Sequence, residues 1–161
     1  MLPLRALAAL LVLPGVVAGL IPACIAARSQ IHRSLWPYGA GLLLVGAALL
    51  LWCVRDFCVS GRGTLAPWDP PRRLVVVGLY RWVRNPMYLA VLVVVAGWAA
   101  LFGSVALLLY LLVLCAGFHL RVVFYEEPWL RRQFGADWDA YAAGVPRWLP
   151  RGRRRDIAGG A

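Results

Sequence analysis

Three long stretches of the chain carry no charged residue and are mostly apolar. They cover residues 6–27, 34–54 and 85–120, which is 22, 21 and 36 residues. A helix that crosses the ~30 Å hydrocarbon core of a membrane needs about 20 apolar residues. Each of the first two stretches fits one spanning helix, and we predict helices over 6–27 and 35–54.

The third stretch is too long for a single crossing. As one helix it would extend about 54 Å, at a rise of ~1.5 Å per residue. Gly103 and Ser104 lie near its middle and are typical turn residues. We therefore predict two short helices, 86–102 and 105–121, packed as a tight hairpin. Since lipid offers no hydrogen-bond partner to an open sheet edge, all the spans should be helical.

Composition narrows the fold to a small membrane protein. The chain has 161 residues, enough for one domain (1–161), and 62% of them are hydrophobic. A soluble domain of this size has too little interior to bury that much apolar surface. The sequence predicts an all-α integral membrane protein with four transmembrane helices, and its first partner is the lipid bilayer.

A net charge of +10 is also found in proteins that bind nucleic acid, so this class has to be considered. All 17 basic residues are Arg, however, and they lie between the apolar stretches. That pattern is typical of membrane topology, so no nucleic-acid partner is expected. The four Cys and two His residues have no metal-ligand spacing, so no metal is expected either.

The distribution of Arg residues predicts the topology. Fifteen of the 17 would share one side with both termini, the loop 55–85 and the tail 122–161, and Arg28 and Arg33 would lie on the other. The positive-inside rule then places both termini of this multi-pass protein in the cytoplasm, and the expected location is a bacterial inner membrane. The Arg-rich end of the tail either binds anionic lipid or acts only as a disordered orientation signal.

The first span has a second interpretation. Arg5, the apolar stretch and the small residues near Ala23 also fit a signal peptide, which would be cleaved. The apolar run is long for a signal, which favours a retained helix. Cleavage would not change the position of the later spans.

Candidate chemistry lies at the cytoplasmic ends of the last two spans. Pro86 suits a helix start with Asn85 as its cap, so Arg84 lies where a helix terminus and a guanidinium both favour an anion. Glu126 and Glu127 form the one adjacent acidic pair, at the end of the fourth span. The hairpin brings this pair close to Arg84, and such a pocket of mixed charge suits a zwitterionic ligand.

The acidic pair also has a simpler interpretation, in which it balances Arg131 and Arg132 on a solvated helix face. We further predict that the fourth helix continues to about residue 134 and that Gly135 ends it. A short helix over 137–143 and an extended segment 145–150 should follow. The loop 59–86 and this helical tail would then form a polar pocket of mixed charge at the cytoplasmic face.

Two separated motifs carry a resemblance to a known family. Residues 74–88 read LVVVGLYRWVRNPMY and residues 126–141 read EEPWLRRQFGADWDAY, and a V-P-R sequence follows at 145–147. They resemble the "LV-x-x-G-x-Y-x-x-x-R-H-P-x-Y" and "E-E-x-x-L-x-x-x-F-G-x-x-Y-x-x-Y" elements, and the closing V-P-R, of the isoprenylcysteine carboxyl methyltransferase and phospholipid methyltransferase family. The resemblance covers about 72–150. Asn85 replaces the family's His, Ala90 a Gly and Trp138 a Tyr.

The resemblance implies an integral membrane methyltransferase that uses S-adenosyl-L-methionine and methylates an acceptor that is embedded in the membrane or linked to lipid. It also implies acceptor binding by Arg121. The chemistry of methyl transfer adds two catalytic candidates, Arg84 to hold the cofactor's carboxylate and Glu127 as the base for an amine acceptor. The resemblance makes the pocket of the loop 59–86 and the helical tail a cytoplasmic cofactor pocket. The cofactor contacts implied by position are Arg73, Leu74, Val75, Tyr80, Asn85, Pro86, Met87, Tyr88 and Glu126, and the charge argument adds Arg84.

Several alternatives stay open at this point. The acceptor is a lipid-linked carboxylate in an isoprenylcysteine carboxyl methyltransferase-like enzyme, or else a phospholipid amine or a small thiol. A non-catalytic four-helix protein is the other class, either a transporter or a pseudo-enzyme. The uncharged spans count against a transporter. The loss of a titratable ring at Asn85 is what makes a pseudo-enzyme conceivable.

Overall fold

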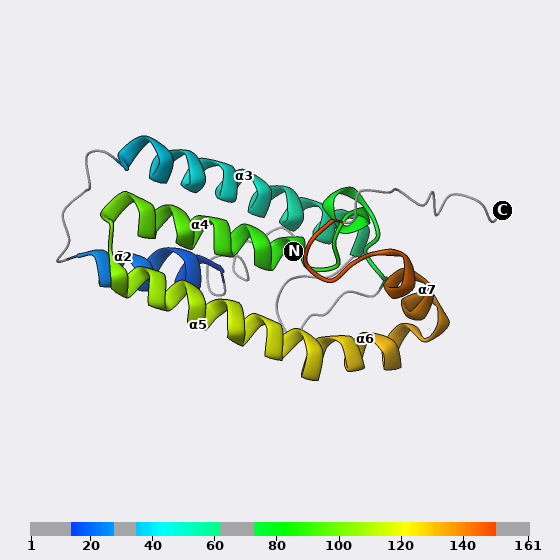
Figure 1. The fold of residues 1–161 in the computed structure, drawn as a ribbon. Coiled ribbons are helices and arrows are strands. Elements are labelled where there is room, and N and C mark those ends of the chain that lie inside the picture. Colours follow the sequence, from blue (N-terminus) through cyan, green and yellow to red (C-terminus); the bar gives the residue numbers. More distant parts are fainter. Residues whose placement is uncertain (1–13, 28–34, 62–72, 151–161) are drawn as a thin grey trace.

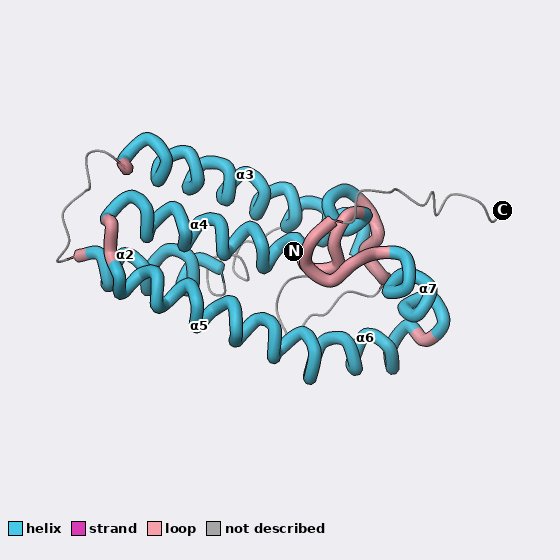
Figure 2. The backbone as a smooth tube through the Cα atoms, viewed as in Figure 1, coloured by secondary structure: helices cyan, strands magenta, loops and turns pink. Residues whose placement is uncertain are grey.

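The computed structural model describes residues 14–27, 35–61 and 73–150 (Figure 1). Within these ranges every regular element is a helix, which confirms the all-α prediction (Figure 2). The elements are the π-helical segment η1 (Val16–Leu20), α2 (Ile21–Ala26), α3 (Trp36–Gly61), the 3-10 turn η2 (Gly78–Arg81), α4 (Pro86–Phe102), α5 (Val105–Arg121), the π-helical segment η3 (Val122–Glu126), α6 (Glu127–Phe134) and α7 (Ala136–Gly144).

Two of the helices are long and apolar enough to cross a membrane, Trp36–Ser60 and the continuous helix Val105–Phe134. Both carry several large apolar side chains that are exposed, as expected of a surface in contact with lipid. Val16–Ala26 and α4 are shorter apolar helices. The count of four spans stays a prediction, and residues 6–13 of the first predicted span lie outside the described residues.

Helices α3 and α4 approach each other so closely that their backbones touch (Figure 1). A Cβ atom at Gly46 of α3 would lie 2.8 Å from the backbone nitrogen of Val94, and one at Gly97 of α4 would lie 2.8 Å from that of Leu43. Small residues at such contacts let apolar helices pack without bulky side chains between them. This contact fixes the position of α4, whose first turn carries the candidate site.

The hairpin between α4 and α5 has the predicted bounds. Gly103 adopts a left-handed conformation with φ 57° and ends α4, and the Ser104 side chain accepts a hydrogen bond from the Leu107 backbone N–H at 3.5 Å at the start of α5. The charge-free stretch 85–120 is thus two helices. The start of α4 and the end of α5 consequently lie at the same end of the bundle (Figure 1).

The helix after the hairpin continues to Phe134 and Gly135 ends it with φ 52°, as predicted. Its one irregularity is the π-helical segment η3, which immediately precedes the turn that contains Pro128. Proline cannot donate to the preceding turn, and a widened turn accommodates that loss. The short helix α7 then confirms the prediction for 137–143.

Helix α3 is longer than the second predicted span, and the end of the span itself stays a prediction. The helix continues to Gly61, whereas the prediction began the loop 55–85 directly after residue 54. Arg55 and Asp56 interrupt the apolar run but not the helix, because charged residues are compatible with helical backbone. The following residues 62–72 lie outside the described residues.

The close approach of α3 and α4 predicts different outcomes for two alanine substitutions in the same helix. Gly46→Ala should destabilise the protein by about 1–3 kcal/mol, because its Cβ meets the α4 backbone. Gly41→Ala should be neutral or slightly stabilising, since nothing lies within 4 Å of a Cβ there and Ala is the better helix former. Thermal unfolding in detergent measures both, and equal melting temperatures would contradict the contact.

Candidate functional site

Polar residues gather where α4 begins, and the chain returns to this point after α7. We call the returning residues 145–150 the tail strap (Figure 1). The backbone N–H of Arg84 donates to the Pro146 carbonyl at 2.9 Å. The Nδ2 group of Asn85 donates to the Arg147 carbonyl at 3.1 Å. These two bonds hold the strap against the first turn of α4.

Asn85 occupies the N-cap position of α4, but its side chain makes no capping hydrogen bond. The prediction of a capping side chain is therefore wrong. The side chain turns to the strap instead, where it donates to Arg147. This bond requires an N–H donor, which a His side chain also offers, so it does not depend on which of the two residues is present.

Glu127, at the start of α6, pairs with one Arg beside the start of α4 and with another in the tail strap. Its Oε1 lies 3.0 Å from Nη1 of Arg84. Arg147 donates to the same carboxylate from Nε at 2.7 Å and from Nη2 at 2.8 Å, in the bidentate geometry that makes such pairs strong. The Arg84 and Glu127 side chains are only 14% and 17% exposed, so water screens this pair weakly.

The charges in this cluster shift one another's pKa values. Burial lowers the pKa of the Arg84 guanidinium, and the Glu127 charge opposes that shift. Burial acts to raise the pKa of the Glu127 carboxyl, but the hydrogen bonds from Arg147 and the charge of Arg84 outweigh it and hold that pKa below its ordinary value. Those same bonds raise the pKa of Arg147. Glu127 is consequently ionised at neutral pH and is a weak base.

Glu126 has different surroundings from its neighbour. Its Oε1 accepts hydrogen bonds from the Tyr88 hydroxyl and, at 2.8 Å, from Nε of Arg121. Arg121 also donates to the Tyr88 hydroxyl oxygen at 3.1 Å. The Glu126 and Arg121 side chains are 26% and 48% exposed. A ligand can therefore reach this carboxylate and guanidinium more easily than it can reach Glu127.

Aromatic rings flank both carboxylates. The Tyr88 ring lies 4.4 Å from Phe118 and 6.5 Å from Trp148, measured between ring centres. The Trp148 indole N–H donates to Nδ1 of His119 at 3.2 Å. On the other side, the Arg84 guanidinium lies 5.7 Å from the centre of the Trp138 ring.

A small hydrophobic core at α7 lies next to the site. Trp138, Tyr141 and Val145 are buried together, and Leu74 packs against them. The Tyr141 hydroxyl donates to the Tyr80 carbonyl at 2.7 Å, which ties α7 to η2. The strap therefore leaves α7 from a fixed position.

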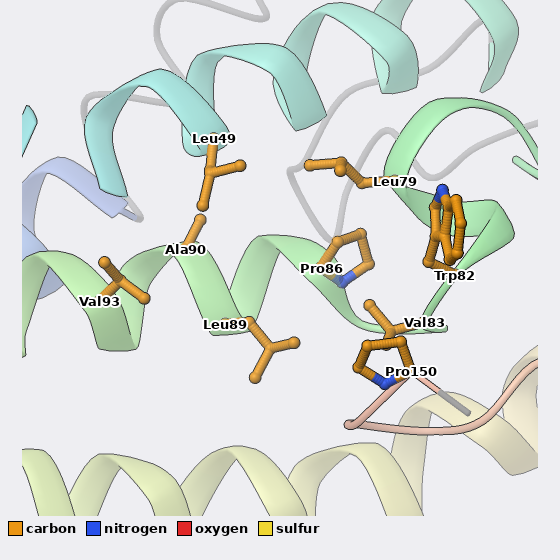
Figure 3. A pocket seen from close by; sticks show the side chains of 9 residues that line it. All are labelled: Leu49, Leu79, Trp82, Val83, Pro86, Leu89, Ala90, Val93 and Pro150. Carbon is orange, nitrogen blue, oxygen red and sulfur yellow. The ribbon is translucent and has the colours of Figure 1, made fainter. Parts of the chain in front are cut away.

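An apolar cavity of about 380 Å³ lies beside the site, between α3, α4, the segment after Gly78 and the end of the strap (Figure 3). Its lining residues are all hydrophobic or aromatic. They are Leu49, Leu79, Trp82, Val83, Pro86, Leu89, Ala90, Val93 and Pro150. Its lining residues Val83 and Pro86 flank Arg84 and Asn85 in the chain.

The structure brings together half of the residues predicted for the site and places the others in supporting positions. The residues that meet are Arg84, Asn85, Tyr88, Arg121, Glu126 and Glu127. Leu74, Val75, Tyr80, Pro86 and Met87 instead pack in the hydrophobic interior, and Arg73 is exposed. The binding and catalytic roles of all these residues stay predictions.

Sequence reasoning missed three residues of this region. Arg147 and Trp148 of the strap were predicted only as part of an extended segment and, for Arg147, of the V-P-R motif, and this motif was the available signal for Arg147. Asp56 was missed because it lies outside the motifs. Its carboxylate is 6% exposed and packs against Gly78, where φ is +55° and a Cβ atom would lie 2.0 Å from Oδ2. Gly78 is thus required by both its conformation and this contact.

Comparison with known proteins gives one match. The family model described as phospholipid methyltransferase matches residues 36–137, which is more than half of the chain. The matched region runs from the start of α3 into α7. No curated protein and no solved structure matches the chain.

The contact of Glu127 with Arg84 and Arg147 predicts that the stability of the protein depends on pH. Glu127→Gln should lower the free energy of unfolding by about 2 kcal/mol at pH 7, or the melting temperature by roughly 4–8 °C. The reason is that two guanidinium groups lose the negatively charged partner that they share. Since the folded pKa of Glu127 lies below its ordinary value of about 4.3, the wild-type advantage is complete above that pH. It should disappear as the pH falls through the folded pKa.

Thermal unfolding from pH 3 to pH 8 in detergent checks this expectation. The matched control is Asp139→Asn, which removes the exposed pair with Arg131, whose side chains are 69% and 51% exposed in the order Arg131 and Asp139. Exposed pairs contribute little, so this variant should melt like the wild type. Equal losses in the two variants, or a Glu127 effect that does not decrease as the pH is lowered, would argue against the contact of Glu127 with the two Arg residues.

Proposed function

Because the chain belongs to the phospholipid methyltransferase family, which its residues 36–137 match, we propose that it transfers a methyl group from S-adenosyl-L-methionine to a lipid-linked acceptor. The family establishes a membrane methyltransferase. The cofactor, the acceptor and the residues that bind them are the proposed part. The observation that carries the proposal is the meeting of two carboxylates, three guanidinium groups and several aromatic rings at one end of an apolar helix bundle.

The residues present fit S-adenosylmethionine, which carries a carboxylate, an ammonium, a sulfonium and an adenosine. Nε of Arg84 is buried and has no hydrogen-bond partner among the described residues, so it is a donor that an anionic group would satisfy. Glu126 is accessible to an ammonium or to ribose hydroxyls. Tyr88 and its neighbouring rings offer faces for a cation or for stacking.

In this proposal the bound cofactor supplies an electrophilic methyl group. The chain's own residues position the reactants in line and exclude water from them. Arg84 and Glu126 hold opposite charges of the ligand, and the tail strap covers the first turn of α4. Positioning of this kind is sufficient for a displacement that needs no acid or base.

The acceptor that the geometry favours is a lipid-linked carboxylate, as in an isoprenylcysteine carboxyl methyltransferase-like reaction. A carboxylate attacks without losing a proton. The structure offers a poor base at the predicted position, because Glu127 is held by Arg84 and Arg147 and its pKa is lowered. Arg121, which is half-exposed, is the proposed contact for such an acceptor.

The second candidate acceptor is a phospholipid amine, and the description of the matching family model favours it. An amine must lose a proton before or during transfer. Glu127 would then have to give up at least one of its two Arg partners to act as the base. In either case the apolar cavity beside Pro86 is the proposed place for an acyl or prenyl chain.

We also retain the predicted membrane arrangement as part of the proposal. Four spans would place both termini and the site at the cytoplasmic face. The end of the bundle at which the site lies agrees with the predicted loop and tail being on one side (Figure 1). The contact of the Arg-rich residues 151–155 with anionic lipid concerns residues outside those that the structure describes.

The first test is binding of S-adenosylmethionine to the purified protein in a maltoside detergent, measured by calorimetry. The wild type should show saturable binding. Arg84→Ala and Glu126→Ala should each weaken it by about tenfold or more, because each removes a charge that the ligand needs. Asp139→Asn, at the exposed pair on α7, should bind like the wild type.

Transfer of a labelled methyl group then identifies the acceptor. The wild type is incubated with vesicles that contain either a prenylated cysteine or phosphatidylethanolamine. Label in a base-labile ester supports the carboxylate acceptor, and label on the phospholipid amine supports the second candidate. A well-folded wild type that binds no S-adenosylmethionine would contradict the proposed function.

A further inference from the structure

Four aromatic side chains from three elements meet beside Glu126. We call Tyr88, Phe118, His119 and Trp148 the aromatic cluster. Tyr88 comes from α4, Phe118 and His119 from the last turns of α5, and Trp148 from the tail strap. The ring centres of His119 and Trp148 are 6.2 Å apart, and that of Tyr88 lies 6.5 Å from Trp148. The cluster therefore forms only when the strap lies in its observed place.

Two contacts fix the orientation of Trp148. Its indole N–H donates to Nδ1 of His119 at 3.2 Å, and the preceding residue, Arg147, is held by Glu127. Phe118 packs against the hydrophobic core of the bundle. Trp148, Phe118 and Tyr88 are each only partly buried, so part of each side chain is accessible to a ligand.

A carboxylate lies at the edge of this cluster. Glu126 accepts a hydrogen bond from the Tyr88 hydroxyl, and its side chain is 26% exposed. Electron-rich ring faces combined with a nearby carboxylate attract cations whose charge is surrounded by methyl or methylene groups. A metal ion or a primary ammonium, in contrast, is better served by oxygen ligands alone.

We propose that the aromatic cluster binds an onium cation and that Trp148 is a specificity-determining residue. The inference rests on the proposed function, in which the onium group is the sulfonium of S-adenosylmethionine. A methylated ammonium on a lipid headgroup has the same chemistry and is the other source of such a cation. If the sulfonium is the ligand, the cluster distinguishes the charged methyl donor from the uncharged thioether that remains after transfer.

The test compares S-adenosylmethionine with S-adenosylhomocysteine, which lacks the methyl group and the positive charge on the sulfur. Calorimetry is performed in maltoside on the wild type, Trp148→Leu and Trp148→Phe. Trp148→Leu should weaken binding of S-adenosylmethionine by about tenfold, while binding of S-adenosylhomocysteine changes by less than about twofold. Trp148→Phe should recover most of the loss, because it restores a ring.

The two substitutions form a matched pair, since both remove the indole N–H that donates to His119. A difference between them reports on the ring and not on the attachment of the strap. Trp129→Leu is the control for loss of an indole elsewhere, because Trp129 lies in α6 against Phe134. It should leave both affinities unchanged.

A second titration, with a monomeric phosphocholine detergent, probes the ammonium source. Weaker phosphocholine binding in Trp148→Leu, with unchanged affinities for both nucleosides, supports the cluster with a lipid headgroup as its ligand. Equal losses for both nucleosides without recovery in Trp148→Phe, or no change for any ligand, would overturn the proposal. If the wild type binds neither nucleoside, the proposed function fails, and the phosphocholine titration still decides on the cluster.

Discussion

The Glu127 carboxylate is shared by two guanidinium groups, and the arrangement of the whole site depends on this contact. Arg84 stands at the start of α4, Glu127 at the start of α6 and Arg147 in the tail strap. Without a common partner the two cations would repel each other in a region that water reaches poorly. A buried or half-buried pair adds little to stability compared with apolar packing, but removal of one partner is costly. Its main effect here is to specify where the strap lies.

The rest of the fold places the three partners within reach of one another. Backbone contact at Gly46 and Gly97 sets α4 against α3, and the hairpin at Gly103 returns the chain along α4. The helix then extends past the bundle to Phe134, and the left-handed Gly135 turns it into α7. Apolar packing thus sets the positions of the helices, and the few charged residues hold the tail strap against them. The site has rigid helices on two sides and a returning segment on the third.

The sequence predicted the parts of this structure that depend on local patterns. Charge-free stretches and turn residues gave the bounds of α4 and α5, and Gly135 and the short helix α7 followed from capping signals. Helix α3 continues beyond residue 54 because a charged residue ends an apolar run without ending a helix. Counting charges along the chain therefore underestimated the length of this helix.

Long-range contacts were predictable only in part. The hairpin implied that Arg84 and the acidic pair meet, and they do, but it did not show which carboxylate each Arg would select. Glu127 and Arg147 are 20 residues apart across a turn and a helix, and neither periodicity nor spacing joins them. The bond from Asn85 to the strap was missed for the same reason, since a cap is a local interpretation and the observed partner lies 62 residues away.

In this account the tail strap completes the proposed binding site because its Arg147 is bound by Glu127. A double-mutant cycle of Glu127→Gln and Arg147→Gln, read out as the affinity for S-adenosylmethionine, tests this most directly. Residues that act through one contact lose their effect together, so the double variant should bind about as well as the weaker single variant. Losses that simply add in the double variant, or single variants that bind like the wild type, would contradict the account.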